Sequence, residues 1–83
     1  MFTSAQLRAA RAILKWSLVD LSEKSSIGTS TLKRLEAADG IPNGHLSTFT
    51  RLIEVFNKAG VQFIGTPDDG PGVRLFNKRV SND

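Results

Sequence analysis

Side chains that can hydrogen-bond to base edges or to phosphates lie close together near the middle of the chain, at Thr29, Ser30, Lys33 and Arg34. The Arg34 guanidinium can donate two parallel hydrogen bonds to guanine, and Lys33 can reach guanine or phosphate. The two hydroxyls are versatile but weakly selective. This chemistry permits contact with nucleic acid. An exposed helical surface with no such partner explains the same four residues, so the surrounding elements must be considered.

Periodicity predicts a short helix over residues 29–38 that carries these side chains, with Leu32 and Leu35 on its apolar side. A loop containing glycine and proline ends it. A longer helix is predicted over residues 45–59, with Gly60 as its C-terminal cap. Spacings of three and four residues predict the apolar face of this longer helix, which comprises Leu46, Phe49, Ile53 and Phe56.

Two helices are predicted ahead of this segment from the spacing of their capping residues. Thr3 and Gln6 have the spacing of a capping box, which predicts a helix that ends near Trp16. Ser17 and Asp20 have the same spacing, which predicts a second, short helix through about residue 25. The apolar residues of these two helices recur at helical spacing and comprise Leu7, Ala10, Leu14, Leu18 and Leu21.

After Gly60 the period changes, and two short strands, 61–64 and 73–76, are predicted around a turn-rich loop. Such a hairpin is marginal in water unless it lies on a helix or against the strands of another chain. The fold class expected is therefore mainly α, a four-helix bundle with a short C-terminal β-hairpin. We divide the chain into residues 1–60, the hairpin 61–76, and a disordered tail 77–83.

Composition excludes several kinds of site. The 83 residues include no Cys and one His, so neither a disulfide framework nor a metal site is expected. No apolar stretch reaches the length needed to cross a membrane and no signal peptide is recognisable, so a cytoplasmic, nucleoid-associated protein is expected. No nucleophile with a base, phosphate loop or carboxylate pair stands out, so we expect no enzyme and no cofactor.

Four ordered motifs connect these elements to a known family: Leu7-Arg8-Ala9-Ala10-Arg11, Leu14-Lys15-Trp16-Ser17, Leu21-Ser22-Glu23-Lys24-Ser25 and Thr31-Leu32-Lys33-Arg34-Leu35-Glu36. Over residues 5–57 the chain resembles the Cro and lambda-repressor-like family of helix-turn-helix regulators, also called the xenobiotic-response-element family. Segments 60–64 and 70–75 resemble an extension found on some small bacterial members. The positive charge accompanies this part of the chain, because residues 1–60 hold eight basic and five acidic side chains.

The resemblance implies roles for particular residues. The helix near 29–38 would be the recognition helix, which enters the major groove of double-stranded DNA, with Thr29, Ser30, Lys33 and Arg34 contacting bases. Arg11 and Glu36 would form a partly buried ion pair that ties the first helix to the third. Backbone amides at helix starts would contact phosphates, at positions Ser17, Asn43, Gly44 and His45.

Three residues depart from the family pattern. Leu18 stands where the family usually has a DNA-contacting Gln, and an apolar residue there is also compatible with a protein contact. Ser26 stands where the turn usually has Gly, which costs about 1 kcal/mol if a left-handed conformation is kept. Gly28 replaces the usual Ser or Thr cap of the recognition helix, at a cost of a few tenths of a kcal/mol.

These expectations combine into a sequence-specific transcriptional regulator, a repressor rather than an activator, that binds a two-fold operator as a homodimer. The hairpin is the expected dimerisation element, so deletion of residues 61–83 should leave a weakly binding monomer. Its interface residues are predicted to be Val61, Phe63, Val73 and Leu75. The alternative is a protein-interaction module of the same fold that sequesters a partner transcription factor.

Overall fold

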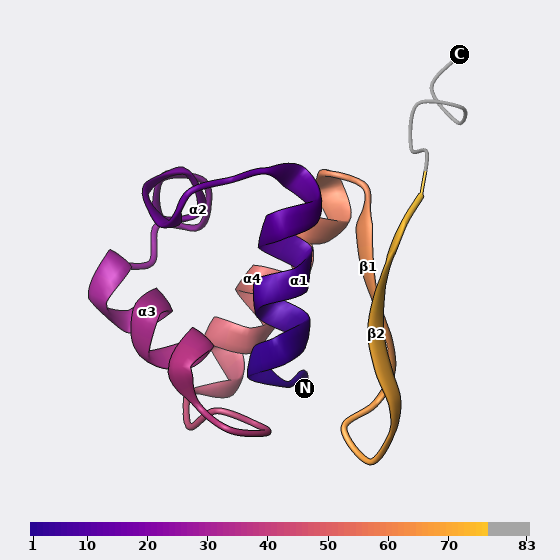
Figure 1. Cartoon of the computed structure of the whole chain (residues 1–83). Helices are drawn as coiled ribbons and strands as arrows, with labels where there is room; N and C mark the ends of the chain where they lie inside the picture. The colour runs from indigo at the N-terminus through magenta and orange to yellow at the C-terminus, as the bar shows by residue number, and fades with distance from the viewer. Residues whose placement is uncertain (77–83) are drawn as a thin grey trace.

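The computed structural model describes residues 1–76. Within them the chain forms a small, mainly helical domain of four helices followed by a two-stranded antiparallel hairpin. The elements are α1 (Ser4–Leu14), α2 (Leu18–Ser25), α3 (Thr29–Ala37), α4 (Leu46–Lys58), β1 (Val61–Thr66) and β2 (Asp69–Leu75). Figure 1 shows α2 and α3 on one side of α1 and the hairpin on the other, with α4 running behind. The predicted fold class is confirmed.

The first two helices begin where their capping residues predicted. Thr3 Oγ1 accepts a hydrogen bond from the Gln6 backbone N–H at 3.1 Å, and the Thr3 N–H donates to Gln6 Oε1 at 2.8 Å. Ser17 and Asp20 exchange the same pair of bonds at the start of α2. Both boxes satisfy backbone donors that a helix start leaves unpaired. The predicted capping boxes are confirmed, although α1 ends at Leu14, two residues before the predicted end.

One hydrophobic core joins all four helices to the first strand. Phe2 is fully buried and its ring lies 4.8 Å from that of Phe49 and 4.9 Å from that of Phe63, measured between centroids. Phe56 packs edge-on against Phe63. The aliphatic part of the core comprises Leu7, Ala10, Leu21, Leu32, Leu35, Leu52 and Val61. The predicted inward positions of the first three helices are therefore confirmed, except that Leu14 and Leu18 are only partly buried at the edge of the core.

The apolar face of α4 differs from the predicted one. Leu46 was assigned to the core but is 71% exposed, whereas Leu52, which was left out, is fully buried. Phe49, Leu52 and Phe56 follow one another at spacings of three and four, so they form a stripe as regular as the predicted one. Leu46 is the first residue of the helix, three residues before the buried Phe49, and lies beyond the edge of the core.

The strands are longer than predicted and the turn between them is shorter. Val61 pairs with Leu75 and Phe63 with Val73, and pairing continues to Thr66 and Asp69. The register shifts beside Gly65, which has a φ of 73°. A Cβ atom at this glycine would lie 2.1 Å from the Gly70 carbonyl oxygen, so only glycine fits here.

The hairpin is supported by helices of its own chain. It contacts α1 and α4, and the Gln6 side-chain amide of α1 donates to the carbonyl oxygens of Ile64 at 3.0 Å and Gly72 at 2.9 Å. These two bonds fix both strands to one helix. The tertiary structure therefore supplies the helix that a two-stranded hairpin needs for stability.

This packing corrects one residue of the predicted dimer interface. Val61 is fully buried and is not available to another chain, whereas Phe63 and Val73 are partly buried against the core of their own chain. Of the four predicted interface residues, Leu75 alone is largely exposed, at 62%. Deletion of residues 61–83 would remove part of the core, so it does not test dimerisation.

Two further expectations concern the C-terminal tail and the absence of a membrane-spanning helix. The predicted disordered tail, residues 77–83, lies outside the described residues. No helix within residues 1–76 is long and apolar enough to cross a membrane.

Candidate nucleic-acid interface

The outer face of α3 carries all four side chains predicted to contact bases. Thr29, Ser30, Lys33 and Arg34 are exposed. The acidic residue of α3, Glu36, is 8% exposed and faces the interior. The solvent-facing surface of α3 is therefore positively charged, and no acidic side chain of this helix competes for its two cations.

The opposite face of α3 is anchored in the core. Leu32 is fully buried and Leu35 is 1% exposed, so the helix rests on two leucines at the predicted positions. Full burial of a leucine side chain contributes about 1.5–3 kcal/mol. The amphipathic pattern thus sets which face of α3 is presented to solvent.

An ion pair joins the C-terminal half of α3 to α1. Arg11 Nε lies 2.7 Å from Glu36 Oε2, and Arg11 Nη2 lies 2.9 Å from Glu36 Oε1, so the contact is bidentate. The hydrogen bond to Glu36 raises the pKa of the Arg11 guanidinium, against the opposing effect of its burial. Arg11 Nη1 also donates to the Trp16 carbonyl oxygen at 3.0 Å. One side chain therefore connects α3, α1 and the segment that leads into α2.

Two further contacts from α1 reach the end of α3, and the sequence did not predict them. The Ser4 hydroxyl donates to the Leu35 carbonyl oxygen, and Arg8 Nη1 donates to the Glu36 carbonyl oxygen. Both acceptors belong to the last turn of α3, where carbonyls lack partners within the helix. Arg8 therefore connects α1 to the end of α3, as Ser4 does. We call Ser4, Arg8, Arg11 and Glu36 the α1–α3 clamp.

The loop before α4 lies beside α3. Arg34 Nη1 donates to the Asn43 carbonyl oxygen at 2.8 Å, which brings the predicted base-contacting and phosphate-contacting residues to one surface. Asn43, Gly44 and His45 are exposed. A Cβ atom at Gly44 would lie 3.3 Å from the Phe49 ring and 3.4 Å from Leu35, so the loop passes close over the core.

The starts of α3 and α4 differ from those of α1 and α2. Among the described residues, neither N-cap position, Gly28 or His45, provides a side-chain hydrogen bond to the helix that follows, and neither first turn contains an acid. The first backbone N–H groups of these helices therefore remain available to a solvent molecule or a ligand anion. Helix starts with these properties are suited to phosphate oxygens.

Ser17 fits a phosphate contact less well than predicted. Its backbone N–H donates to Asp20 Oδ2 at 2.9 Å, and its hydroxyl oxygen accepts from the Asp20 N–H. These hydrogen bonds lower the pKa of the Asp20 carboxyl group, so a negative charge stays at the start of α2 at neutral pH. The amide that was expected to meet a phosphate is therefore already bonded, and the neighbouring charge repels anions.

The three departures from the family pattern have structural consequences. Ser26 ends α2 with a φ of 61°, so the left-handed conformation is kept without glycine. Gly28 has an extended conformation and provides no cap. Leu18 is half-buried and packs against the core, so it provides neither the usual DNA contact nor a fully exposed apolar one.

Within residues 1–76 no group of three or more acidic or His side chains could hold a metal ion. In comparisons with known proteins, the chain matches no protein-family model and no curated protein. The site must therefore be interpreted from its own geometry.

Proposed function

We propose that this protein is a sequence-specific DNA-binding regulator of transcription, a repressor that acts as a homodimer on a two-fold operator. The resemblance of its helical motifs to the Cro and lambda-repressor-like family motivates the proposal. In this interpretation α2 and α3 form a helix-turn-helix unit, and α3 enters the major groove of the duplex.

The exposed cationic face of α3 is the observation that carries the proposal. Lys33 and Arg34 are exposed to solvent. The backbone N–H groups at the uncapped starts of α3 and α4 can donate hydrogen bonds to phosphate oxygens. The α1–α3 clamp holds this surface in one orientation, which base recognition requires because hydrogen bonds to base edges are directional. Selection of bound sites from a random duplex pool tests the proposal, and half-sites related by a two-fold axis are the expected result.

Arg34→Lys is expected to weaken binding to the selected site about 10- to 100-fold and to relax the preference at one base pair. Lysine keeps the charge but cannot donate two parallel hydrogen bonds to guanine. The slope of affinity against salt concentration should stay unchanged, because the number of neutralised phosphates is the same. Fluorescence anisotropy with the selected duplex and with single-base variants measures both quantities.

Arg74→Lys is the matched control, since it makes the same exchange at an exposed arginine of the hairpin, on the other side of α1 (Figure 1). Its affinity and base preference should equal those of the unaltered protein. If Arg34→Lys retained the full base preference, Arg34 would not be a base reader.

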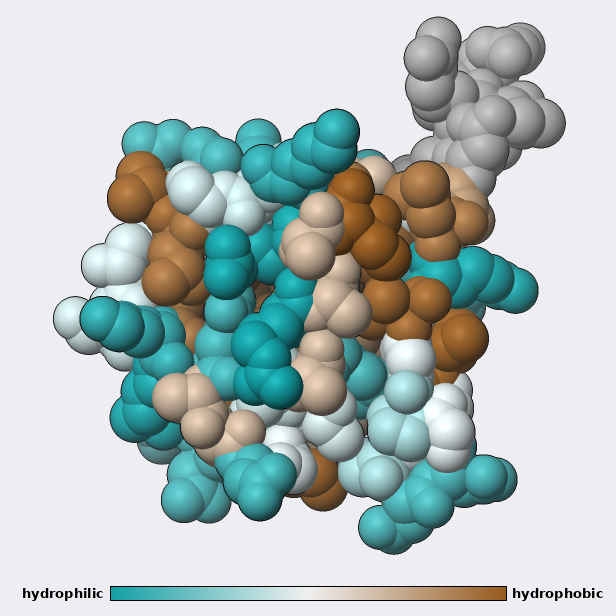
Figure 2. All heavy atoms as spheres, viewed as in Figure 1, coloured by the Kyte–Doolittle hydropathy of each residue, from teal (hydrophilic) through white to brown (hydrophobic). Residues whose placement is uncertain are grey.

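The proposed homodimer surface keeps Leu75 from the predicted interface but not Val61, which is buried in the core. Apolar surface gathers where the C-terminal half of α1 meets the hairpin (Figure 2). Exposed residues on these elements include Leu75, at 62%, and Ile13 and Ile64, each at 38%. A second copy of the chain that covered this surface would remove these apolar side chains from water.

Leu75→Glu is expected to convert the dimer into a monomer, because a charge cannot be buried in an apolar contact without a partner. Light scattering measures the molar mass of the protein in solution, which should fall to that of a monomer. The affinity for the two-fold DNA site should fall as well. Val19→Glu is the control for the mass alone, since Val19 is 57% exposed on α2, away from the hairpin. A Leu75→Glu protein with the mass of a dimer would show that another surface pairs the chains.

The alternative function, sequestration of a transcription factor by a protein-interaction module, loses part of its support with the half-burial of Leu18. The dependence of binding on salt concentration distinguishes the two functions. Binding to a duplex weakens steeply as salt rises, because condensed counterions are released. Tight, salt-insensitive binding to a protein, with no duplex retained at low salt, would favour the alternative.

A further inference from the structure

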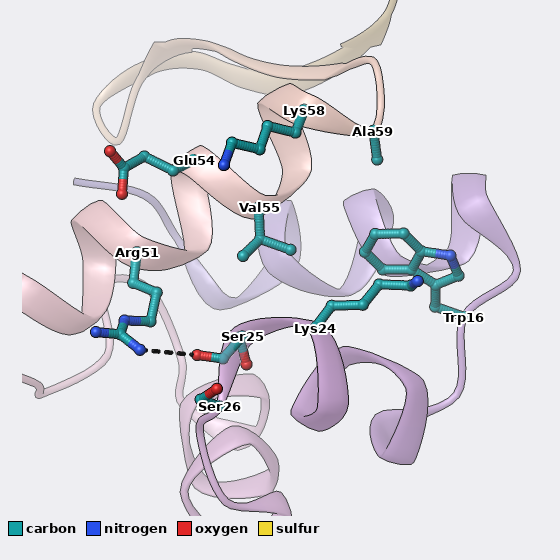
Figure 3. Close-up of a pocket in the computed structure, with 9 residues that line it drawn as sticks. All are labelled: Trp16, Lys24, Ser25, Ser26, Arg51, Glu54, Val55, Lys58 and Ala59. Atoms are coloured by element: carbon teal, nitrogen blue, oxygen red, sulfur yellow. Dashed lines mark hydrogen bonds between the residues drawn. The ribbon is translucent and has the colours of Figure 1, made fainter.

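A hollow of about 490 Å³ lies between α2 and α4, away from the outer face of α3. Its lining comprises Trp16, Lys24, Ser25, Ser26, Arg51, Glu54, Val55, Lys58 and Ala59. Figure 3 shows the indole of Trp16 and the Lys24 side chain at one end, and Arg51 and Glu54 at the other. The volume lies within the range of small-molecule sites, 300–1,000 Å³.

Positive charge dominates the lining. Lys24, Arg51 and Lys58 face one acid, Glu54, and none of the three cations forms an ion pair within the described part of the chain. Arg51 Nη1 donates to the Ser25 carbonyl oxygen at 3.2 Å, which leaves most of its five N–H donors uncommitted (Figure 3). The hollow is therefore suited to an anionic group that accepts hydrogen bonds.

All three cations have a structural role without a ligand. Lys24 and Lys58 lie in the last turns of α2 and α4, where a positive charge offsets the helix dipole. Arg51 lies in the middle of α4, but it bonds to the carbonyl oxygen of Ser25, the last residue of α2. Arg51 differs from the two lysines in its planar guanidinium, whose remaining N–H donors can bind a carboxylate through two parallel bonds.

An aromatic wall completes the hollow. Trp16 is half-buried and its ring stacks on Phe56 with 5.6 Å between centroids, which fixes its orientation. The Lys24 ammonium lies 5.1 Å from the centroid of the indole, so a cation and an aromatic face already lie side by side. Val55 adds apolar surface next to them.

We propose that this hollow binds a small aromatic carboxylate. The carboxylate accepts hydrogen bonds from Arg51 and the lysine ammonium groups, and the ring packs against Trp16 and Val55. Charge and aromatic surface both contribute, because a bidentate bond between arginine and carboxylate adds geometric selectivity to packing.

The hollow also adjoins the turn that leads into α3. Ser25 and Ser26 belong to its lining, and Ser26 holds the left-handed conformation that redirects the chain toward Thr29. A ligand in contact with this turn changes the orientation of α3 and hence the affinity for DNA. This consequence, unlike the binding site itself, rests on the proposed function.

Titration with benzoate tests the site without DNA. Trp16 is the one tryptophan of the chain, so the NMR signal of its indole N–H reports directly on the hollow. Benzoate is expected to shift this signal saturably. Benzamide, which lacks the charge, and cyclohexanecarboxylate, which lacks the aromatic ring, should each bind at least about 10-fold more weakly.

Arg51→Gln should weaken benzoate binding about 10- to 100-fold, whereas Lys33→Gln, which removes a charge from the outer face of α3, should leave it unchanged. Lys58→Gln provides a second test that keeps the bond between Arg51 and Ser25, and it should also weaken binding. Equal shifts with benzamide, unaltered binding in both hollow variants, or no saturable shift with benzoate would overturn the proposal.

A last measurement adds the duplex selected above. Saturating benzoate should change its affinity at least about 3-fold in the unaltered protein and leave the affinity of Arg51→Gln unchanged. A protein that bound benzoate but retained no duplex would contradict the DNA-binding function and leave the site intact. A protein that bound the duplex but not benzoate would contradict the binding site in the hollow and leave the DNA-binding function intact.

Discussion

Arg11→Met is expected to lower the free energy of unfolding by about 3 kcal/mol, because it leaves the Glu36 carboxylate without its partner in a poorly solvated position. The Glu36 side chain is 9% exposed, and both of its oxygens receive hydrogen bonds from Arg11. The value is at the lower end for buried pairs because Arg11 is itself 26% exposed. Urea denaturation followed by circular dichroism measures the change.

A double variant, Arg11→Met with Glu36→Met, is the control that separates charge from packing. Replacing both partners of an ion pair with apolar side chains of similar volume removes the unpaired charge, so most of the lost stability should return. The DNA affinity of both variants should be lower than that of the unaltered protein, since the directional contact between α1 and α3 is gone. A loss below about 1 kcal/mol for Arg11→Met alone would show that the ion pair does not hold α3.

Phe56→Ala is expected to lower the free energy of unfolding by about 3–5 kcal/mol. Phe56 is fully buried and its ring contacts the rings of Trp16 and Phe63, so its loss opens a cavity where α4, the junction before α2 and the hairpin meet. A domain of this size typically has a total stability of about 5–10 kcal/mol. The variant should therefore unfold at a much lower urea concentration, measured by circular dichroism.

Leu46→Ala on the same helix is the matched control. Leu46 is 71% exposed, so its truncation should change stability by less than about 0.5 kcal/mol. If the two variants lost similar stability, Leu46 would belong to the core and the face of α4 would be the one predicted from periodicity. Leu52→Ala, at a fully buried position, should resemble Phe56→Ala.

Features that depend on neighbouring residues could be predicted from the sequence. The capping boxes of α1 and α2 connect residues three apart, so their spacing is visible in the chain. The spacing of Leu32 and Leu35 placed the polar residues of α3 on the exposed face for the same reason. The pairing of Arg11 with Glu36 was implied by the family resemblance, and the two residues do lie together.

Features that depend on distant residues could not be predicted in this way. Two stripes on α4 are equally regular, and the choice between Leu46 and Leu52 depends on where the other helices lie. Strand alternation left open whether Val61 and Phe63 face another chain or their own helices. In the structure the strands face their own helices, because the Gln6 side chain donates hydrogen bonds to two strand carbonyl oxygens. These acceptors lie 58 and 66 residues along the chain, so no local pattern contains the contact.

Local spacing was therefore sufficient to establish the number and kind of the elements, the starts of the helices, and the polar face of α3, because backbone caps and helical periodicity act over three or four residues. Three-dimensional packing alone selected the buried face of α4, turned the hairpin onto α1, and assembled the hollow beside Trp16 and Arg51. The reason is that burial is collective: a side chain is inside or outside according to what the rest of the chain places over it.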